Sequence, residues 1–230
     1  MKQIILFDID GTLLNVQSGF MHRLIGEVFD ELGLQAPDLH NTSFAGRTDR
    51  GIFNGLLGEQ LHRPGVFEEV RKAYIQRLDR QLESQHVEVI ESARETLDYC
   101  RKQQIMIGLL TGNFRESAYI KLNRAGLDHY FSFGAFGCDY AERRHLPRLA
   151  KVEIKTKFDR DIRPHEMIII GDTPSDIQTA HRYGAHSVAV STGHYDHKTL
   201  AEHQPSILLN SLEQPEQWLQ YFDNSLETGS

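Results

Sequence analysis

The chain has 230 residues, a formal net charge of −7 and, with 40% hydrophobic and 25% charged residues, the composition of an ordinary soluble globular protein. The negative charge disfavours nucleic acid or an anionic membrane as the main partner, so we expect a small ligand. No apolar run approaches the roughly 18 residues of a membrane helix, and no signal-like segment precedes the first strand. Two cysteines, Cys100 and Cys138, are typical of free thiols in a reducing compartment. We therefore expect a cytoplasmic protein.

The first predicted strand is the apolar run at residues 4–7, which leads into Asp8, Asp10 and a Gly-Thr turn. An uncharged apolar run is typical of a buried strand in a parallel sheet. Asp8 and Asp10 are two residues apart, so their side chains share a face if the strand continues through them. Two neighbouring carboxylates need a cation or a shared proton, and Mg²⁺ prefers such oxygen ligands. The alternative is an exposed strand end, or an Asx turn made by Asp10.

Helical spacing replaces the strand pattern after Leu14. Apolar residues recur at helical intervals in three stretches, residues 20–32, 52–57 and 66–82. Because residues 15–88 show no convincing strand, we predict a small helical cap domain there. An insertion directly after the first strand would lie above the carboxyl edge of the sheet, where it can act as a lid.

Strands and helices alternate through residues 89–230, which with residues 1–14 form the predicted core. Apolar runs at residues 87–90, 105–110, 167–170, 187–190 and 207–209 predict strands, and residues 131–136 form a further short apolar segment. Helices are predicted from a Ser-x-x-Glu capping box at Ser92 and at residues 115–125, 146–158, 174–183 and 215–222. This alternation predicts an α/β fold with a doubly wound parallel sheet.

Polar residues follow three of the predicted strands: Asp8 with Asp10, then Thr111, then Asp172. The carboxyl ends of parallel strands meet at one edge of a sheet, so we expect these residues to converge. Asp172 could then complete a magnesium site with Asp8 and the backbone carbonyl of Asp10, and Asp176 could support it. A plain helix N-terminus at Asp172 and a simple turn at Thr111 are the alternatives.

The Asp-x-Asp-Gly-Thr segment at residues 8–12 resembles the first motif of the haloacid dehalogenase-like superfamily, and the later stretches match its remaining motifs in order. The closest resemblance is to phosphoglycolate phosphatase-like members with a small helical cap on a Rossmann-like core. This resemblance implies that Asp8 is a nucleophile that forms an aspartyl-phosphate, and that Asp10 is the acid and base. It also implies Mg²⁺ as the cofactor. An acid at position 10 favours phosphoryl transfer over dehalogenation, because a halide needs no proton to leave.

Phosphate would be held by the Thr111 hydroxyl, by the backbone N–H groups of Gly112 and Asn113, and by a cationic side chain. The Lys-Pro pair of the family pattern is missing here, and the stretch from Glu142 to Leu146 stands in its place. Arg143 is the candidate cation in this stretch. Arg144 and Lys151 remain open, and a solvated basic helix start is the alternative.

Arg47 lies in a polar bend between two cap helices, which in similar small-capped members faces the active site. It could hold a carboxylate or a second phosphate of the substrate, although an exposed surface arginine is the simpler interpretation. Phosphonate hydrolases of this superfamily need a cap lysine to form a Schiff base. Lys72 is the one lysine in the sequence of the predicted cap, and its place in a charged helix disfavours that chemistry. The spacing of His181, His186, His194 and His197 fits no zinc pattern.

These observations predict a Mg²⁺-dependent phosphatase that acts on a small phosphorylated metabolite, as a monomer or a homodimer. A phosphomutase of the same superfamily is the nearest alternative, with His22 as an extra acid-base group. A regulatory module that binds phosphate without turnover is the alternative from another class.

Overall fold

The computed structural model describes residues 3–35, 37–39 and 41–225 of the chain. Within these residues, six parallel strands form the main sheet. From one edge to the other their order is β5 (Gly134–Phe136), β4 (Met106–Thr111), β1 (Ile4–Phe7), β6 (Met167–Gly171), β7 (His186–Val190) and β8 (Ile207–Leu209). The first strand is therefore central, as expected for a doubly wound sheet, and the predicted fold class is confirmed.

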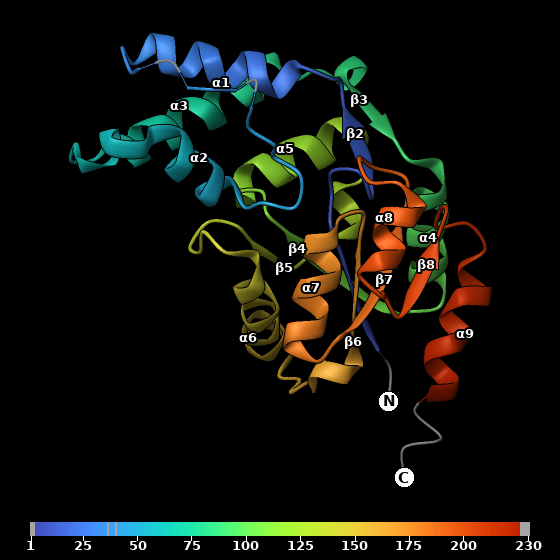
Figure 1. The fold of residues 1–230 in the computed structure, drawn as a ribbon. Coiled ribbons are helices and arrows are strands. Elements are labelled where there is room, and N and C mark those ends of the chain that lie inside the picture. Colours follow the sequence, from blue (N-terminus) through green and yellow to red (C-terminus); the bar gives the residue numbers. More distant parts are fainter. Residues whose placement is uncertain (1–2, 36, 40, 226–230) are drawn as a thin grey trace.

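The two faces of β1 explain how the sheet is buried. Ile5 and Phe7 point into one apolar cluster, whereas Ile4 and Leu6 point into another. The first cluster lies under three helices, α4 (Glu91–Lys102), α5 (Arg115–Ala125) and α9 (Pro215–Ser225). The second lies under α6 (Leu146–Phe158) and α7 (Pro174–Tyr183). Helices thus cover both faces of the sheet (Figure 1), and the charge-free strands need no polar face.

A second, two-stranded antiparallel sheet joins β2 (Leu14–Val16) to β3 (Val87–Val89). Between these strands lie three helices with an apolar cluster of their own, α1 (Phe20–Glu31), α2 (Asp49–Leu57) and α3 (Val66–Gln81). We call this segment, residues 17–86, the insert. Figure 1 shows its helices together at one end of the molecule, above the sheet. Short 3-10 helices complete the chain at Gly58–His62, Ser84–His86, Asp128–Tyr130, Arg143–His145 and Pro164–Glu166.

For most predicted elements of the core, at least one end lies within one or two residues of the end in the structure. Three details differ. The capping box predicted at Ser92 is wrong, because α4 begins at Glu91 and Ser92 Oγ accepts the backbone N–H of Leu212 instead. The three-residue strand β2 was not predicted, since three residues are too few to show an alternating pattern. Helix α8 (His197–Glu202) was also missed, and its N-cap is Asp196.

The insert is docked on the core through the segment from Arg47 to Gly51. The N–H of Asp49 donates to the carbonyl of Gly112 at 2.7 Å, and Thr48 Oγ1 donates to the carbonyl of Ala141. A Cβ on Gly112 would lie 2.0 Å from the carbonyl oxygen of Arg47, so only glycine allows this approach. The insert therefore contacts the same edge of the sheet that carries the polar strand ends.

Within the described ranges, no helix is both long and apolar enough to span a lipid bilayer.

Candidate active site

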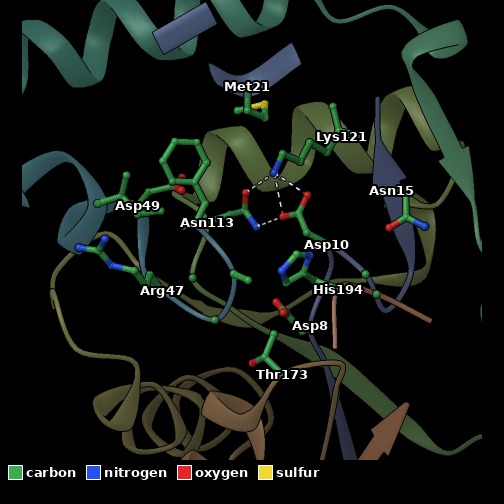
Figure 2. Close-up of a pocket in the computed structure, with 18 of the residues that line it drawn as sticks. Asp8, Asp10, Asn15, Met21, Arg47, Asp49, Asn113, Lys121, Thr173 and His194 are labelled. Carbon is green, nitrogen blue, oxygen red and sulfur yellow. Dashed lines mark hydrogen bonds and ion pairs between the residues drawn. The ribbon is translucent and has the colours of Figure 1, made fainter. Parts of the chain in front are cut away.

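A cavity of about 330 Å³ lies between the carboxyl edge of the sheet and the insert. The core lines it with the residues that follow its central strands, and the insert lines it with side chains from α1, α2 and α3 (Figure 2). The predicted site residues among those lining it are Asp8, Asp10, Arg47, Gly112, Asn113, Arg143 and Asp172. The parallel topology thus brings together residues that are more than a hundred positions apart in the chain.

Three carboxylates form an acidic cluster, and two of them, Asp8 and Asp172, line this cavity. One oxygen from each of Asp8, Asp172 and Asp176 lies within 4.8 Å of the others, and all three residues are buried. Among the described histidine, cysteine and acidic residues, this is the set whose spacing could hold a metal ion. The structure thus brings Asp8 and Asp172 together.

Arg143 places a positive charge directly against the cluster. Its Nη2 lies 3.1 Å from Asp8 Oδ1 and 2.5 Å from Asp176 Oδ1, and it also donates to the carbonyl of Leu110. The other two candidate cations lie elsewhere on the surface, where Arg144 pairs with Glu142 and Lys151 with Asp161. Of the three, the structure brings only Arg143 to the predicted nucleophile.

Burial and mutual repulsion dominate the electrostatics of the cluster. Burial raises the pKa of Asp8 to about 6, although Arg143 opposes the shift. Burial, followed by the charges of Asp176 and Asp8, raises the pKa of Asp172 well above its ordinary value. Burial alone would lower the pKa of Arg143, but the two neighbouring carboxylates hold it above its usual range. Three acids facing one arginine leave a formal charge of −2 when all are ionised, which a divalent cation would balance.

The surroundings of Asp172 also fit a metal ion. Its Oδ1 is buried without a hydrogen-bond partner in the described part of the chain. The backbone at Gly11 and Gly193 packs directly against the same carboxylate, since a Cβ on either residue would come within 2.4 Å of Asp172 Oδ2. An unpaired buried carboxylate oxygen is costly unless something binds it. The oxygen-only donor set matches a hard ion such as Mg²⁺.

Helix α7 presents Asp176 through a reciprocal cap. Thr173 Oγ1 accepts the N–H of Asp176 at 3.3 Å and donates to Asp176 Oδ2 at 2.7 Å, and the Thr173 N–H donates to that same oxygen. Pro174 follows at the first turn, where its missing N–H is not needed. This is the helix start that the Asp-Thr-Pro sequence predicted. The cap fixes one oxygen of Asp176, so its other oxygen faces Arg143.

Asp10 is held in a separate polar network on the insert side of Asp8 (Figure 2). Its carboxylate accepts hydrogen bonds from the Lys121 ammonium and from Asn113 Nδ2, all at 2.8 Å. Asn113 Nδ2 also donates to Thr111 Oγ1. Thr111 itself is fully buried and, unlike Gly112 and Asn113, is not among the residues that line the cavity. The carboxylate of Asp10 is not part of the acidic cluster, which leaves its backbone carbonyl as the expected ligand.

Arg47 does not point at the acidic cluster. Its side chain is exposed and donates to the carbonyl of Gly51 at 3.0 Å, and Figure 2 shows its guanidinium turned away from Asp8 and Asp10. His22, the extra acid-base candidate, lines the cavity and stacks on Phe44 with ring centroids 4.5 Å apart. Lys72 is exposed on α3 and is not among the residues lining the cavity.

Comparison with known proteins gives the family. The model of the haloacid dehalogenase-like hydrolases matches residues 5–190. The chain belongs to this family. Pyrophosphatase PpaX of Bacillus cereus strain Q1 is 24% identical over 219 residues, covering 90% of this chain and 92% of that protein. The family resemblance and the prediction that the chain is a hydrolase are therefore confirmed.

Solved structures of this hydrolase fold superpose along nearly the whole chain. A predicted phosphoglycolate phosphatase from Haemophilus somnus 129pt gives a TM-score of 0.72 at 18% identity and covers 95% of this chain and 98% of its own. A β-phosphoglucomutase from Clostridium difficile gives a TM-score of 0.70 at 18% identity, with 98% and 99% covered. At these identities the likeness shows the fold alone.

The hydrolase has two further charged residues in its cavity that the sequence analysis missed. Lys121 occupies the buried stripe of α5, between Ala118 and Ala125, and a lysine on an apolar stripe was the available signal. Asp49, at the start of α2, accepts hydrogen bonds from the N–H of Phe114 and from Ser117 Oγ. Its contact with α5 joins residues distant in sequence, so no local pattern could show it.

Proposed function

We propose that this hydrolase is a Mg²⁺-dependent phosphatase that cleaves a small phosphomonoester through an aspartyl-phosphate on Asp8. The observation that carries the proposal is the position of Asp8. It is a buried carboxylate beside Arg143 and two further acids, with another carboxylate, Asp10, two residues along the chain. That combination provides a nucleophile, a counter-charge for phosphate and a separate acid-base group.

Asp8, Asp172 and the backbone carbonyl of Asp10 would hold Mg²⁺, and Asp176 would support them. When bound, the ion would neutralise phosphate oxygens and align the phosphorus with Asp8. The orphaned Oδ1 of Asp172 and the clustering of the three acids support this assignment. Arg143, fixed by Asp176, would face the charge that develops on the phosphoryl group.

In the first step an oxygen of Asp8 attacks phosphorus, and the bond from phosphorus to the ester oxygen breaks. Asp10 gives its proton to the departing alkoxide, which leaves as the alcohol. In the second step Asp10 takes a proton from water, and the water oxygen attacks the phosphorus of the aspartyl-phosphate. Phosphate leaves and Asp8 is restored. The N–H groups of Gly112 and Asn113 and the hydroxyl of Thr111 would bind the remaining phosphate oxygens.

We further propose that residues 15–88 act as a cap on a core formed by residues 1–14 and 89–230. The antiparallel β2–β3 pair and the docked segment at residues 47–51 support this division. The cap would select the leaving group, with Arg47 able to reach a second anionic group if its bond to Gly51 is released. The names of the relatives, a pyrophosphatase and a predicted phosphoglycolate phosphatase, support small phosphorylated substrates.

A phosphomutase is the second candidate, because His22 lines the cavity on the insert side. His22 could act as an acid-base group for the substrate hydroxyl to which a mutase returns the phosphoryl group. A mutase would turn over simple phosphomonoesters slowly and would need a bisphosphate primer. A phosphatase would turn them over continuously without a primer.

The test is hydrolysis of p-nitrophenyl phosphate and a panel of phosphorylated metabolites, with and without Mg²⁺, by the wild type and Asp8→Asn. We expect Mg²⁺-dependent turnover in the wild type and a loss of at least about 100-fold in Asp8→Asn. Equal activity of the two proteins would refute the nucleophile. The absence of turnover with every phosphomonoester would instead favour a regulatory module.

A further inference from the structure

Lys121 is a buried cation in the cavity that the proposed reaction does not yet use. Its side chain is 5% exposed, whereas the side chain of its partner Asp10 is 44% exposed. The lysine therefore approaches Asp10 from the protein side and leaves the outer side of the carboxylate open to the cavity. Figure 2 shows Lys121 reaching from α5 toward Asp10 and Asn113.

Every hydrogen of the ammonium group has an acceptor. Lys121 Nζ lies 2.8 Å from both oxygens of Asp10 and 2.7 Å from Oδ1 of Asn113. An ammonium group has three donors and no acceptor, so these contacts use its full capacity. A substrate group could bind Lys121 only by displacing one of them. The geometry is that of a residue that orients another side chain, rather than one that binds substrate.

Asn113 completes the network and ties it to a second strand. Its two amide hydrogens go to Asp10 Oδ2 and Thr111 Oγ1, each at 2.8 Å, while its Oδ1 accepts from Lys121. The donors of Lys121 and Asn113 are thus all used, which makes the protein side of the network rigid. Turning the Asp10 carboxylate would break several hydrogen bonds at once.

We propose that Lys121 is a positioning residue, which with Asn113 fixes the carboxylate of Asp10 in the orientation that serves the leaving oxygen of the substrate. This inference rests on the proposed function, because it assigns Asp10 the transfer of a proton to the leaving group. The polar contacts described for Lys121 are with Asp10 and Asn113, not with the acidic cluster around Asp8.

Leaving-group dependence distinguishes this role from a structural one. An alkyl phosphate needs a proton on its departing oxygen, whereas p-nitrophenolate leaves without one. Lys121→Met keeps most of the length of the side chain and removes its charge and donors. We expect kcat/KM, which reports the steps up to release of the leaving group, to fall about 100-fold for an alkyl phosphate that the wild type hydrolyses and at most about threefold for p-nitrophenyl phosphate.

A double-mutant cycle with Asp10→Asn tests whether Lys121 acts through Asp10. When Asp10 is already replaced, Lys121→Met should cost at most about a further threefold on the alkyl phosphate. Lys155→Met is the control, because Lys155 pairs with Asp159 on the surface, and it should match the wild type. Lys121→Gln supplies a neutral amide donor in place of the ammonium, so it should lose less activity than Lys121→Met. If the methionine variant does not fold, the glutamine variant replaces it in every comparison.

Crystal structures of the wild type and the Lys121 variant give a readout that needs no turnover. We expect the Asp10 carboxylate to leave its present orientation in the variant. Unchanged Asp10 geometry, or equal losses on both substrates in an active enzyme, would overturn the role of Lys121 while the phosphatase proposal stands. A wild type that hydrolyses no phosphomonoester would overturn the proposed function, and this role with it.

Discussion

At the scale of single residues, Arg143 is the cation that faces the acidic cluster. It is buried between Asp8 and Asp176, so its removal leaves three acids packed without their counter-charge. Losing one partner of a buried ion pair costs about 3–5 kcal/mol. We predict that Arg143→Met lowers the free energy of unfolding by about that amount without Mg²⁺, measured by urea denaturation.

Arg144→Met is the matched control for that measurement. Its guanidinium pairs with Glu142 on the surface, where such pairs contribute about 1 kcal/mol at most. Similar unfolding free energies for the two variants would contradict the position assigned to Arg143. Mg²⁺ should also raise the free energy of unfolding of the wild type, since the ion binds only the folded cluster.

Asp49 gives a prediction on pH. Burial raises its pKa from 3.8 to about 6 in the folded protein, although Lys121 opposes the shift. The folded state therefore binds the proton more tightly than the unfolded state, and this contribution to stability is lost as pH rises from about 4 through about 6. Asn at position 49 could still accept the N–H of Phe114 without carrying the charge.

We predict that Asp49→Asn gains stability relative to the wild type as pH rises through that window. The measurement is urea denaturation of both proteins at pH 4.5, near the lower end of the range from about 4 to about 6, and at pH 7.5, above that range. A difference between them that stays constant with pH would contradict the raised pKa.

At the scale of elements, the start of α7 decides where Asp176 points. Thr173→Ala removes the side-chain cap and one of the two donors to Asp176 Oδ2. The loss of such a cap costs about 1 kcal/mol and up to about 2 kcal/mol. We predict this decrease in the free energy of unfolding, together with weaker Mg²⁺ binding by calorimetry. Thr173→Ser keeps the hydroxyl and should retain both properties, and a serine variant as weak as the alanine variant would refute the capping role.

The same elements show what sequence reasoning can and cannot reach. The ends of α5, α6 and α7 were predictable because Gly126, Pro147 and Thr173 are local signals for helix ends. Ser92 carried an equally good local signal, but its hydroxyl oxygen accepts a hydrogen bond from the backbone N–H of Leu212 instead of capping the helix. A long-range partner can thus override a capping motif, and nothing within a few residues reveals it.

The candidate site follows the same division. Asp8, Asp172, Asp176 and Arg143 could be named from motifs because parallel strands end at one edge. Asp49 gave no local signal, and a lysine on an apolar stripe could flag Lys121 but not its partner, because both places depend on how α5 and the insert pack against that edge. The direction of Arg47 was equally beyond the sequence, since it depends on a bond to Gly51 within α2.

At the scale of the whole molecule, the insert closes the cavity by resting on Gly112. Gly112→Ala would place a Cβ 2.0 Å from the carbonyl oxygen of Arg47. We predict that this variant displaces the docked segment, lowers phosphatase activity at least about tenfold and leaves the circular dichroism of the core unchanged. Gly26→Ala is the control, because its Cβ would meet only Leu39 at 3.7 Å and alanine favours a helix. Full activity of Gly112→Ala would show that the docked segment is not needed.

The central claim is that a phosphoryl group passes through Asp8. The most direct test is to quench the enzyme during turnover of a phosphomonoester, reduce it with borohydride and map its peptides by tandem mass spectrometry. An aspartyl-phosphate at Asp8 is reduced to homoserine at that position. We predict homoserine at position 8 in the wild type, only when substrate and Mg²⁺ are present, and none in Asp8→Asn. Continued turnover with no reduced residue, or with homoserine at position 10 or 172 instead, would contradict the account.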